Sequence, residues 1–300
     1  MTDTLRQRRP RWQRFLLLLV LILILVAVNA LYTPAESWRG VLAAEPGDLL
    51  YAAGFDGFSE EWVQDPGRDS QTMIDGTMRL SLGTINTIFS QATPHFEDFD
   101  MRVTAATVEG PEDNGYGVIF RLQSDERSCT VGILFCDLSR VGLLRVVRSL
   151  IETQVVEDTA PGYYMFLISA DGYYSLWRGG DTDTTKRIST WIPSDLVQTG
   201  LDSDNQIRVV GRGNQFQFFI NGQNVALCIP DNPDAESTYV AGTCSDGTMQ
   251  TVWEDDNFAI GQIGMVAMAT ITGGEGVVVE FDNLTITQPD DGSDMEVDRT

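Results

Sequence analysis

The sequence predicts an all-β protein, an antiparallel sandwich or barrel, behind one N-terminal membrane helix. Three observations predict it: runs in which apolar and polar residues alternate, turn pairs such as Asn221-Gly222 between those runs, and an unbroken apolar stretch near the N-terminus. Alternation with a period of two indicates a strand with one buried face, because successive side chains of a strand point to opposite faces. Helical periodicity is nearly absent after the apolar stretch, and residues 143–151 are the one ambiguous run.

The N-terminal segment is strongly basic and then apolar. Phe15 to Val28 form the apolar run, which Tyr32 ends, and five arginines precede it: Arg6, Arg8, Arg9, Arg11 and Arg14. Because arginines are retained on the cytoplasmic side, we expect a cytoplasmic segment over residues 1–14 and a transmembrane signal anchor over residues 15–32. This makes a single-pass protein of the cell membrane, with an extracellular C-terminal domain. The alternative is a cleaved signal peptide, with residues 28–30 as the cleavage site.

The exported part divides into three. Residues 33–47 are expected to be a stalk, and residues 288–300 (QPDDGSDMEVDRT) a disordered acidic tail with little to bury. The roughly 240 residues between them, 48–287, fit one large β domain better than two.

Alternating runs and turn pairs mark the strands of this domain. The runs cover residues 99–105, 118–122, 215–220 and 277–286. Turn residues fall between such runs at Asp75-Gly76, Asp171-Gly172, Gly211 to Asn214, and Asn221-Gly222. Asn-Gly between two runs is the strongest short-range hairpin signal, because both turn positions need a positive φ angle.

Composition excludes several classes of function. The 300 residues include 43 acidic and 20 basic side chains and one histidine, for a formal net charge of -23. A chain this acidic does not bind nucleic acid through a broad basic surface. One histidine excludes His-rich metal sites and most histidine-based proton relays.

The order of several segments resembles a known superfamily. The segments are FDGFSEEW (55–62), IDGTMRL (74–80), FDMRV (99–103), DNGYGVIFR (113–121), YYMFLIS (163–169), DGYYSL (171–176), IGMVA (263–267) and VEFDNL (279–284). Over roughly residues 50–287 the series resembles the bacterial exported jelly rolls of the concanavalin A-like lectin/glucanase superfamily, nearest to the laminin-G-like and 3-keto-disaccharide hydrolase-like domains. The resemblance implies a two-sheet jelly-roll sandwich. Two insertions depart from it, at residues 124–162 and at about residues 228–257.

Each insertion carries one pair of cysteines. Four cysteines allow three pairings, and we expect Cys129–Cys136 and Cys228–Cys244, because each bond would close its own insertion. An exported location permits disulfides. Four free thiols are the alternative, whereas a zinc site is disfavoured because the chain has no Cys-x-x-Cys.

A cluster of aromatic and polar residues is the candidate ligand site. Its members are Asn114, Tyr116, Arg121, Tyr164, Tyr174 and Trp177, which approach one another if the strands pair as the resemblance implies. Sugar rings pack on aromatic faces, and arginine and asparagine hold hydroxyl groups by hydrogen bonds. The alternative for each ring is ordinary packing in the core or between strands.

Catalytic and metal sites are less well supported. Glu280 and Asp282 are the nearest match to the E-x-D-x-x-E strand of the glucanase branch, but Thr285 replaces the third carboxylate, so we interpret both as structural. His95 is interpreted as a surface or edge residue. The acidic stretches at residues 112–114, 181–183 and 254–257 match no calcium motif, so calcium is possible only in principle and no cofactor is expected.

These patterns favour a membrane-tethered extracellular module that binds a neutral glycan or a protein partner without chemistry. An acidic surface repels anionic polysaccharides. The alternatives are a glycoside hydrolase of the keto-disaccharide type and a purely structural surface domain.

Overall fold

The structure is a computed structural model that describes residues 12, 17–24, 44–56, 61–67, 69–123, 162–180, 185–269 and 276–290. The chain divides into two units, residues 1–37 with 126–156, and residues 38–125 with 157–300. In the first unit, residues 17–24 are helical. No helix among the described residues is both long and apolar enough to cross a bilayer. The predicted anchor over residues 15–32 is therefore not shown, and most of it lies outside the described residues.

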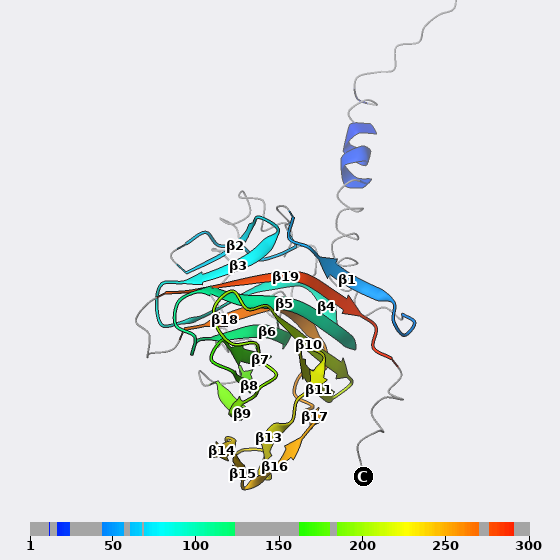
Figure 1. Ribbon diagram of the computed structural model, residues 1–300. Helices are drawn as coiled ribbons and strands as arrows, with labels where there is room; N and C mark the ends of the chain where they lie inside the picture. The colour runs from blue at the N-terminus through cyan, green and yellow to red at the C-terminus, as the bar shows by residue number, and fades with distance from the viewer. Residues whose placement is uncertain are drawn as a thin grey trace, which may run out of the picture. The chain divides into compact units, whose positions relative to one another are not determined.

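The second unit is a sandwich of two antiparallel sheets (Figure 1). The nine-stranded sheet has the order β12-β11-β10-β5-β19-β3-β2, and β1 pairs with β19 and β17 with β11. Its strands are β1 (Leu49–Ala53), β2 (Ser70–Ile74), β3 (Thr77–Leu82), β5 (Phe99–Glu109), β10 (Asn205–Arg212), β11 (Gln215–Ile220), β12 (Gln223–Asn224), β17 (Trp253–Glu254) and β19 (Val277–Thr287).

The second sheet has six strands in the order β4-β18-β6-β7-β8-β9. They are β4 (Thr87–Phe96), β6 (Gly115–Leu122), β7 (Tyr163–Ser169), β8 (Tyr173–Gly179), β9 (Lys186–Pro193) and β18 (Gly261–Met268). Two small ribbons, β13 (Leu227–Pro230) with β16 (Gly247–Gln250) and β14 (Thr238–Val240) with β15 (Thr243–Ser245), belong to the second insertion. The predicted all-β antiparallel class is confirmed, and the jelly-roll architecture follows from the two sheets and their crossovers.

The main core lies between the two sheets, and alternate side chains of each strand fill it. In β11 the burial alternates along the strand, with Phe216, Phe218 and Ile220 inside. Facing rings such as Phe120 and Phe166 come from the six-stranded sheet, and Phe166 lies 4.8 Å from Phe218 between ring centroids. Side chains from two inner faces that interdigitate in this way form the usual sandwich core.

Two of the predicted turns have the expected backbone. Asp75 and Gly76 connect β2 to β3 with φ angles of 51° and 84°, and Asn221 and Gly222 connect β11 to β12 with 49° and 81°. Both central residues of a type I′ turn need a positive φ, so these pairs set the register of their hairpins.

A bulge interrupts β6. Gln262 pairs with Leu122 and Gly264 with Ile119, so Phe120 and Arg121 together oppose the single residue Ile263. Arg121 has a φ of 53°. A bulge re-aims side chains, and here both Phe120 and Arg121 turn inward.

Candidate functional site

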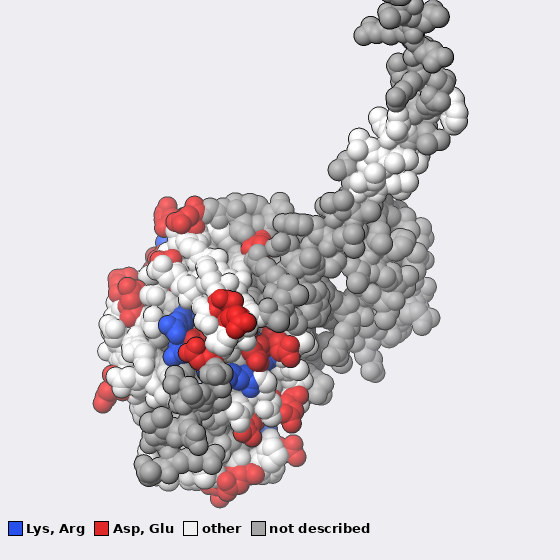
Figure 2. Space-filling model, turned by 90° about the vertical axis from the view of Figure 1, so that its right-hand side faces the viewer, with Lys and Arg blue, Asp and Glu red and all other residues white. Residues whose placement is uncertain are grey.

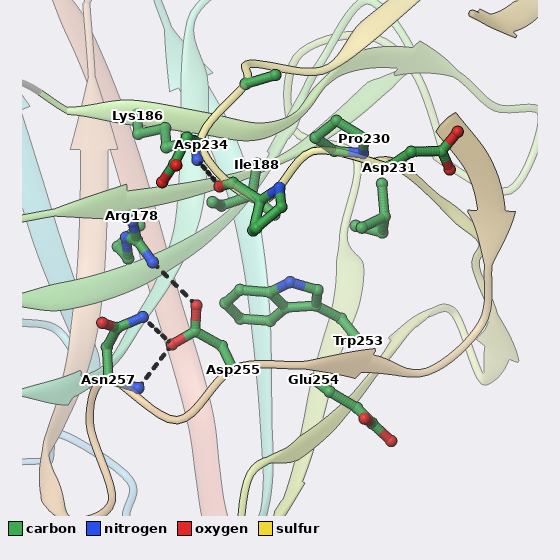
Figure 3. Close-up of a pocket in the computed structure, with 13 residues that line it drawn as sticks. Arg178, Lys186, Ile188, Pro230, Asp231, Asp234, Trp253, Glu254, Asp255 and Asn257 are labelled. Atoms are coloured by element: carbon green, nitrogen blue, oxygen red, sulfur yellow. Dashed lines mark hydrogen bonds and ion pairs between the residues drawn. The ribbon is translucent and has the colours of Figure 1, made fainter. Parts of the chain in front are cut away.

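A pocket opens where β8 and β9 meet the second insertion. Its volume is about 340 Å³, which falls within the range of small-ligand sites. It is lined by apolar and polar side chains together: Arg178, Lys186, Ile188, Ile229, Pro230, Asp231, Pro233, Asp234, Ala235, Trp253, Glu254, Asp255 and Asn257. Figure 3 shows Arg178 and Asn257 converging on Asp255, with the Trp253 ring beside it.

Asp255 is the fixed point of this pocket. Its carboxylate accepts hydrogen bonds from Arg178 Nη1 at 3.0 Å, from the Asn257 backbone N–H at 2.8 Å and from Asn257 Nδ2 at 2.6 Å. The Tyr164 hydroxyl donates a fourth. The Asp255 backbone N–H donates to the Asn214 carbonyl at 2.9 Å. Charge-assisted bonds of this kind hold side-chain geometry firmly, so Arg178 and Asn257 are oriented before any ligand arrives.

Trp253 forms an ordered apolar floor. It lies in β17, which pairs with β11 through Phe216, and it is only 4% exposed. Its ring meets Tyr164 edge-on, with centroids 4.9 Å apart, and lies 5.5 Å from Phe216. The edge-to-face pair with Tyr164 is favourable beyond the area it buries, and the tilted contact with Phe216 joins the floor to the main core.

The second insertion supplies the opposite wall, and a disulfide closes it. Cys228 and Cys244 are bonded, with Cα atoms 5.4 Å apart, as the sequence predicted. The Cys228 backbone N–H donates to Ser189 Oγ at 3.1 Å, which ties the wall to β9. The other predicted pair, Cys129–Cys136, lies outside the described residues.

Lys186 crosses the gap between the sheet and this wall. Its ammonium donates to the Pro233 carbonyl. Burial lowers the pKa of Lys186, and the nearby Arg178 charge lowers it further. The pocket therefore holds hydrogen-bond donors on the sheet side and carboxylates, including Asp234, on the insertion side.

The predicted aromatic platform is not what the structure shows. Tyr116, Tyr164 and Tyr174 lie in the main core, with at most 5% of each residue exposed. The Tyr174 hydroxyl donates to the Ala226 carbonyl at 2.6 Å, and the Tyr116 hydroxyl accepts from Asn205 Nδ2 at 3.3 Å. Burial raises the pKa of Tyr116 and of Tyr174 to about 12, and it also raises the pKa of Tyr164. Rings on the inner face of the sheet cannot receive a ligand without opening the core.

The polar members of the predicted cluster are buried too. Asn114 Nδ2 donates to the Pro111 carbonyl at 3.1 Å and holds a turn before β6. Arg121 is fully buried at the bulge, and its Nη2 donates to the Gly213 carbonyl at 3.0 Å. Its guanidinium lies 5.7 Å and 5.6 Å from the ring centroids of Phe99 and Phe216, and burial lowers its pKa to about 10.

Trp177 lies apart from the other five, on the outward face of the six-stranded sheet. That face carries a second apolar cluster around Ile119, Leu122, Met165, Leu167 and Val266, with Phe89, Tyr163, Trp177, Trp191 and Met268 packed against it. The Arg187 guanidinium lies 6.0 Å from the Trp177 ring centroid. The six predicted ligand-binding residues are thus divided between two faces.

The candidate catalytic residues lie elsewhere. Glu280 is in an ion pair with Arg79 across β19 and β3, and Asp282 accepts hydrogen bonds from Asn283 at 2.6 Å and 2.7 Å. His95 is 6% exposed in β4. Within the described ranges, no group of three or more histidine, cysteine, aspartate and glutamate side chains could hold a metal ion.

Sequence reasoning missed the residues that build the pocket. Residues 254–257 stood out only as an acidic stretch, and neither Trp253 nor Lys186 was predicted to bind a ligand. One usable signal was the tripeptide Asp255-Asp256-Asn257. An aspartate side chain that accepts a hydrogen bond from the backbone N–H two residues later forms a local turn.

No family model matches the chain, and no curated protein matches it. Solved structures are similar in fold. They include the carbohydrate binding module CBM66 from Bacillus subtilis, with 11% identity, a TM-score of 0.43 and coverage of 76% of this chain and 95% of that one. A Bacillus licheniformis β-glucanase has 8% identity, a TM-score of 0.44 and coverage of 82% and 99%. The catalytic domain of a Thermotoga petrophila laminarinase has 9% identity, a TM-score of 0.45 and coverage of 82% and 99%.

At this level of similarity, neither a ligand nor an activity passes from those proteins to this chain. The 3-keto-disaccharide hydrolase-like family is not shown by these comparisons.

Proposed function

We propose that the pocket binds a sugar residue of a neutral glycan, without chemistry. The observation that carries the proposal is the set of four hydrogen bonds on Asp255, which fixes Arg178 and Asn257 beside Lys186 and above an indole floor. Sugar hydroxyls both donate and accept hydrogen bonds, so they suit a pocket that offers ammonium and guanidinium donors on one side and carboxylates on the other.

Charge at the rim favours a neutral ligand over an acidic one. Asp231, Asp234 and Glu254 are exposed pocket residues, and the ion pair with Asp255 already offsets the charge of Arg178. The net charge of the chain is -23. Like-charge repulsion therefore disfavours uronate-rich or sulfated polysaccharides.

Thermal unfolding of the full chain tests the proposal. Oligosaccharides from β-glucan, xylan and fructan form the neutral panel, and oligogalacturonate is the acidic comparison. A ligand at a hundred times its dissociation constant stabilises a fold by about 2.7 kcal/mol, which is a clear shift of the midpoint. Recovery of intact sugar afterwards supports binding without hydrolysis. No shift with any neutral member would refute the proposal.

Lys186→Ala is expected to weaken binding of the active oligosaccharide about tenfold, because one charge-assisted hydrogen bond is lost. Arg187→Ala is the matched control: the neighbouring side chain pairs with Glu236 at 2.7 Å and lies near Trp177, outside the pocket. Isothermal titration calorimetry measures both variants. Equal losses in the two would place the ligand elsewhere.

We also propose that residues 15–32 tether this domain to the outside of the cell membrane. The support is the order of five arginines and an apolar run in the sequence. A chain that retains the segment is expected to stay in the membrane fraction after alkaline carbonate extraction and to be digested by protease added to intact spheroplasts. Release of a shortened chain into the medium would instead show cleavage near residue 30.

A further inference from the structure

Three arginines gather on the outward face of the nine-stranded sheet. Arg102 in β5 lies opposite Arg208 in β10, and Arg212 ends β10. We call these three side chains the arginine cluster. Asp100 accepts from Arg102 Nη2 at 2.8 Å and from Arg208 Nε and Nη2 at 2.7 Å and 2.8 Å. The Arg208 guanidinium also lies 4.5 Å from the Phe219 ring centroid. Two of the three guanidinium groups are thus oriented in advance.

The cluster keeps an excess of positive charge. Burial acts to raise the pKa of Asp100, but its bonds to Arg208 and Arg102 outweigh burial and hold that pKa below its usual value. Asp100, together with the nearby Asp290 whose charge also acts on Arg102, makes two negative charges against three positive ones. The Arg102 side chain is 46% exposed, so part of its guanidinium faces solvent. On the face drawn in Figure 2, acidic side chains are widely spread and basic ones are confined to a few places.

The chain leads from β19 directly to this cluster. Thr287, the last residue of β19, pairs with Asp100. The next residue, Gln288, exchanges backbone hydrogen bonds with Asp48 and Gly47 at 2.8 Å and 2.9 Å. Arg212 Nε then donates to the Asp290 carbonyl at 2.8 Å. The pKa of Arg102 is raised, first by its hydrogen bond to Asp100 and also by the charge of Asp290.

We propose that the arginine cluster is the docking surface for residues 291–300 of the same chain. This segment carries Asp291, Asp294, Glu296 and Asp298. In an extended backbone, side chains two residues apart point the same way, so a segment bound in that conformation would present Asp294, Glu296 and Asp298 on one side. Ten extended residues reach about 33 Å, which is several times the spacing between neighbouring strands.

Electrostatics favours this place over the acidic parts of the domain surface. An acidic segment is repelled by an acidic surface and attracted to a local excess of positive charge. Exposed ion pairs are individually weak and are screened by salt, so the contact is expected to form at low ionic strength and to loosen at high ionic strength. The same surface then becomes available to a separate acidic partner. This inference does not depend on the sugar pocket, which lies at β8 and β9.

A competition experiment tests the docking. The acceptor is the full chain with a neutral tail, made by Asp291→Asn, Asp294→Asn, Glu296→Gln and Asp298→Asn. The probe is a fluorescein-labelled peptide with the sequence of residues 287–300. Fluorescence anisotropy at 20 mM and 500 mM salt is expected to show binding to the acceptor at low salt only. The unmodified chain should bind the peptide at least tenfold more weakly, because its own tail occupies the surface.

Two further variants of the acceptor locate the surface. Arg102→Gln is expected to weaken peptide binding at least fivefold. Arg79→Gln, which removes another arginine of the same sheet that is already paired with Glu280, should leave binding unchanged. Equal binding to the unmodified chain and the acceptor would show a surface open to a separate acidic partner and overturn the assignment to the tail. Absence of binding to the acceptor, or equal effects of the two arginine variants, would overturn it as well.

Discussion

Asp255→Ala is expected to lower the free energy of unfolding by about 2–4 kcal/mol and to abolish sugar binding. The substitution removes the acceptor for four donors at once, and it leaves the partly buried Arg178 charge and the Tyr164 hydroxyl without their partner. Donors stranded in this way lose the full free energy of the contact and keep the cost of desolvation. Urea unfolding measures the stability, and calorimetry with the active oligosaccharide measures the binding.

Two companion variants separate charge from shape. Asp255→Asn keeps an oxygen acceptor but loses the ion pair. Its free energy of unfolding should therefore lie between that of the wild type and that of the alanine variant. Asp256→Asn is the matched control, because this exposed neighbour accepts one bond, from Asn214 Nδ2 at 2.7 Å, and an amide oxygen can replace it. Its expected change is within about 0.5 kcal/mol. If the control cost as much as Asp255→Ala, Asp255 would not be the fixed point of the pocket.

The fold could be predicted because its signals are local. Alternation in residues 215–220 gave the inner face of β11, and the pairs Asp75-Gly76 and Asn221-Gly222 gave hairpins with the required positive φ angles. The Cys228–Cys244 bond could also be predicted, since both cysteines lie in one insertion. Each of these inferences depends on residues that are close in sequence.

The inner and outer faces of the six-stranded sheet could not be told apart in the same way. Residues 118–122 were predicted as an alternating run with one buried face, but both faces of β6 are apolar and every residue of the strand is buried. Tyr163 and Tyr164 look equivalent in the sequence, but the first packs on the outward cluster and the second in the main core. The bulge then moves Arg121 inward, where strict alternation after Phe120 would have placed it outside.

The pocket was missed for a related reason. Arg178, Lys186, Pro233 and Asp255 come from β8, β9 and two parts of the insertion, so no fixed spacing connects them. Only the packing of the insertion against the sheet edge brings their side chains together. A sequence shows which residues could bind a sugar, but not which of them a tertiary contact will leave at a surface.

The disulfide is expected to stabilise that packing. Cys228→Ala with Cys244→Ala should lower the free energy of unfolding by roughly 3 kcal/mol, because the bond closes a short loop and restricts the unfolded chain. Sugar affinity should fall as well, since Ile229 and Pro230 follow Cys228 directly in the pocket wall. Substitution is preferable to a reducing agent, which would also act on any bond between Cys129 and Cys136.

Met249→Ala is the control for the double cysteine variant, because Met249 pairs with Cys228 across the same ribbon and is 44% exposed. Its expected effect on stability is small. A double variant that loses stability but keeps its affinity would show that the bond acts on the unfolded chain alone, while the Cys228 bond to Ser189 is enough to hold the wall. Loss of both stability and sugar affinity would show that the disulfide orders the wall. The insertion would then form a binding pocket only after its cysteines are oxidised.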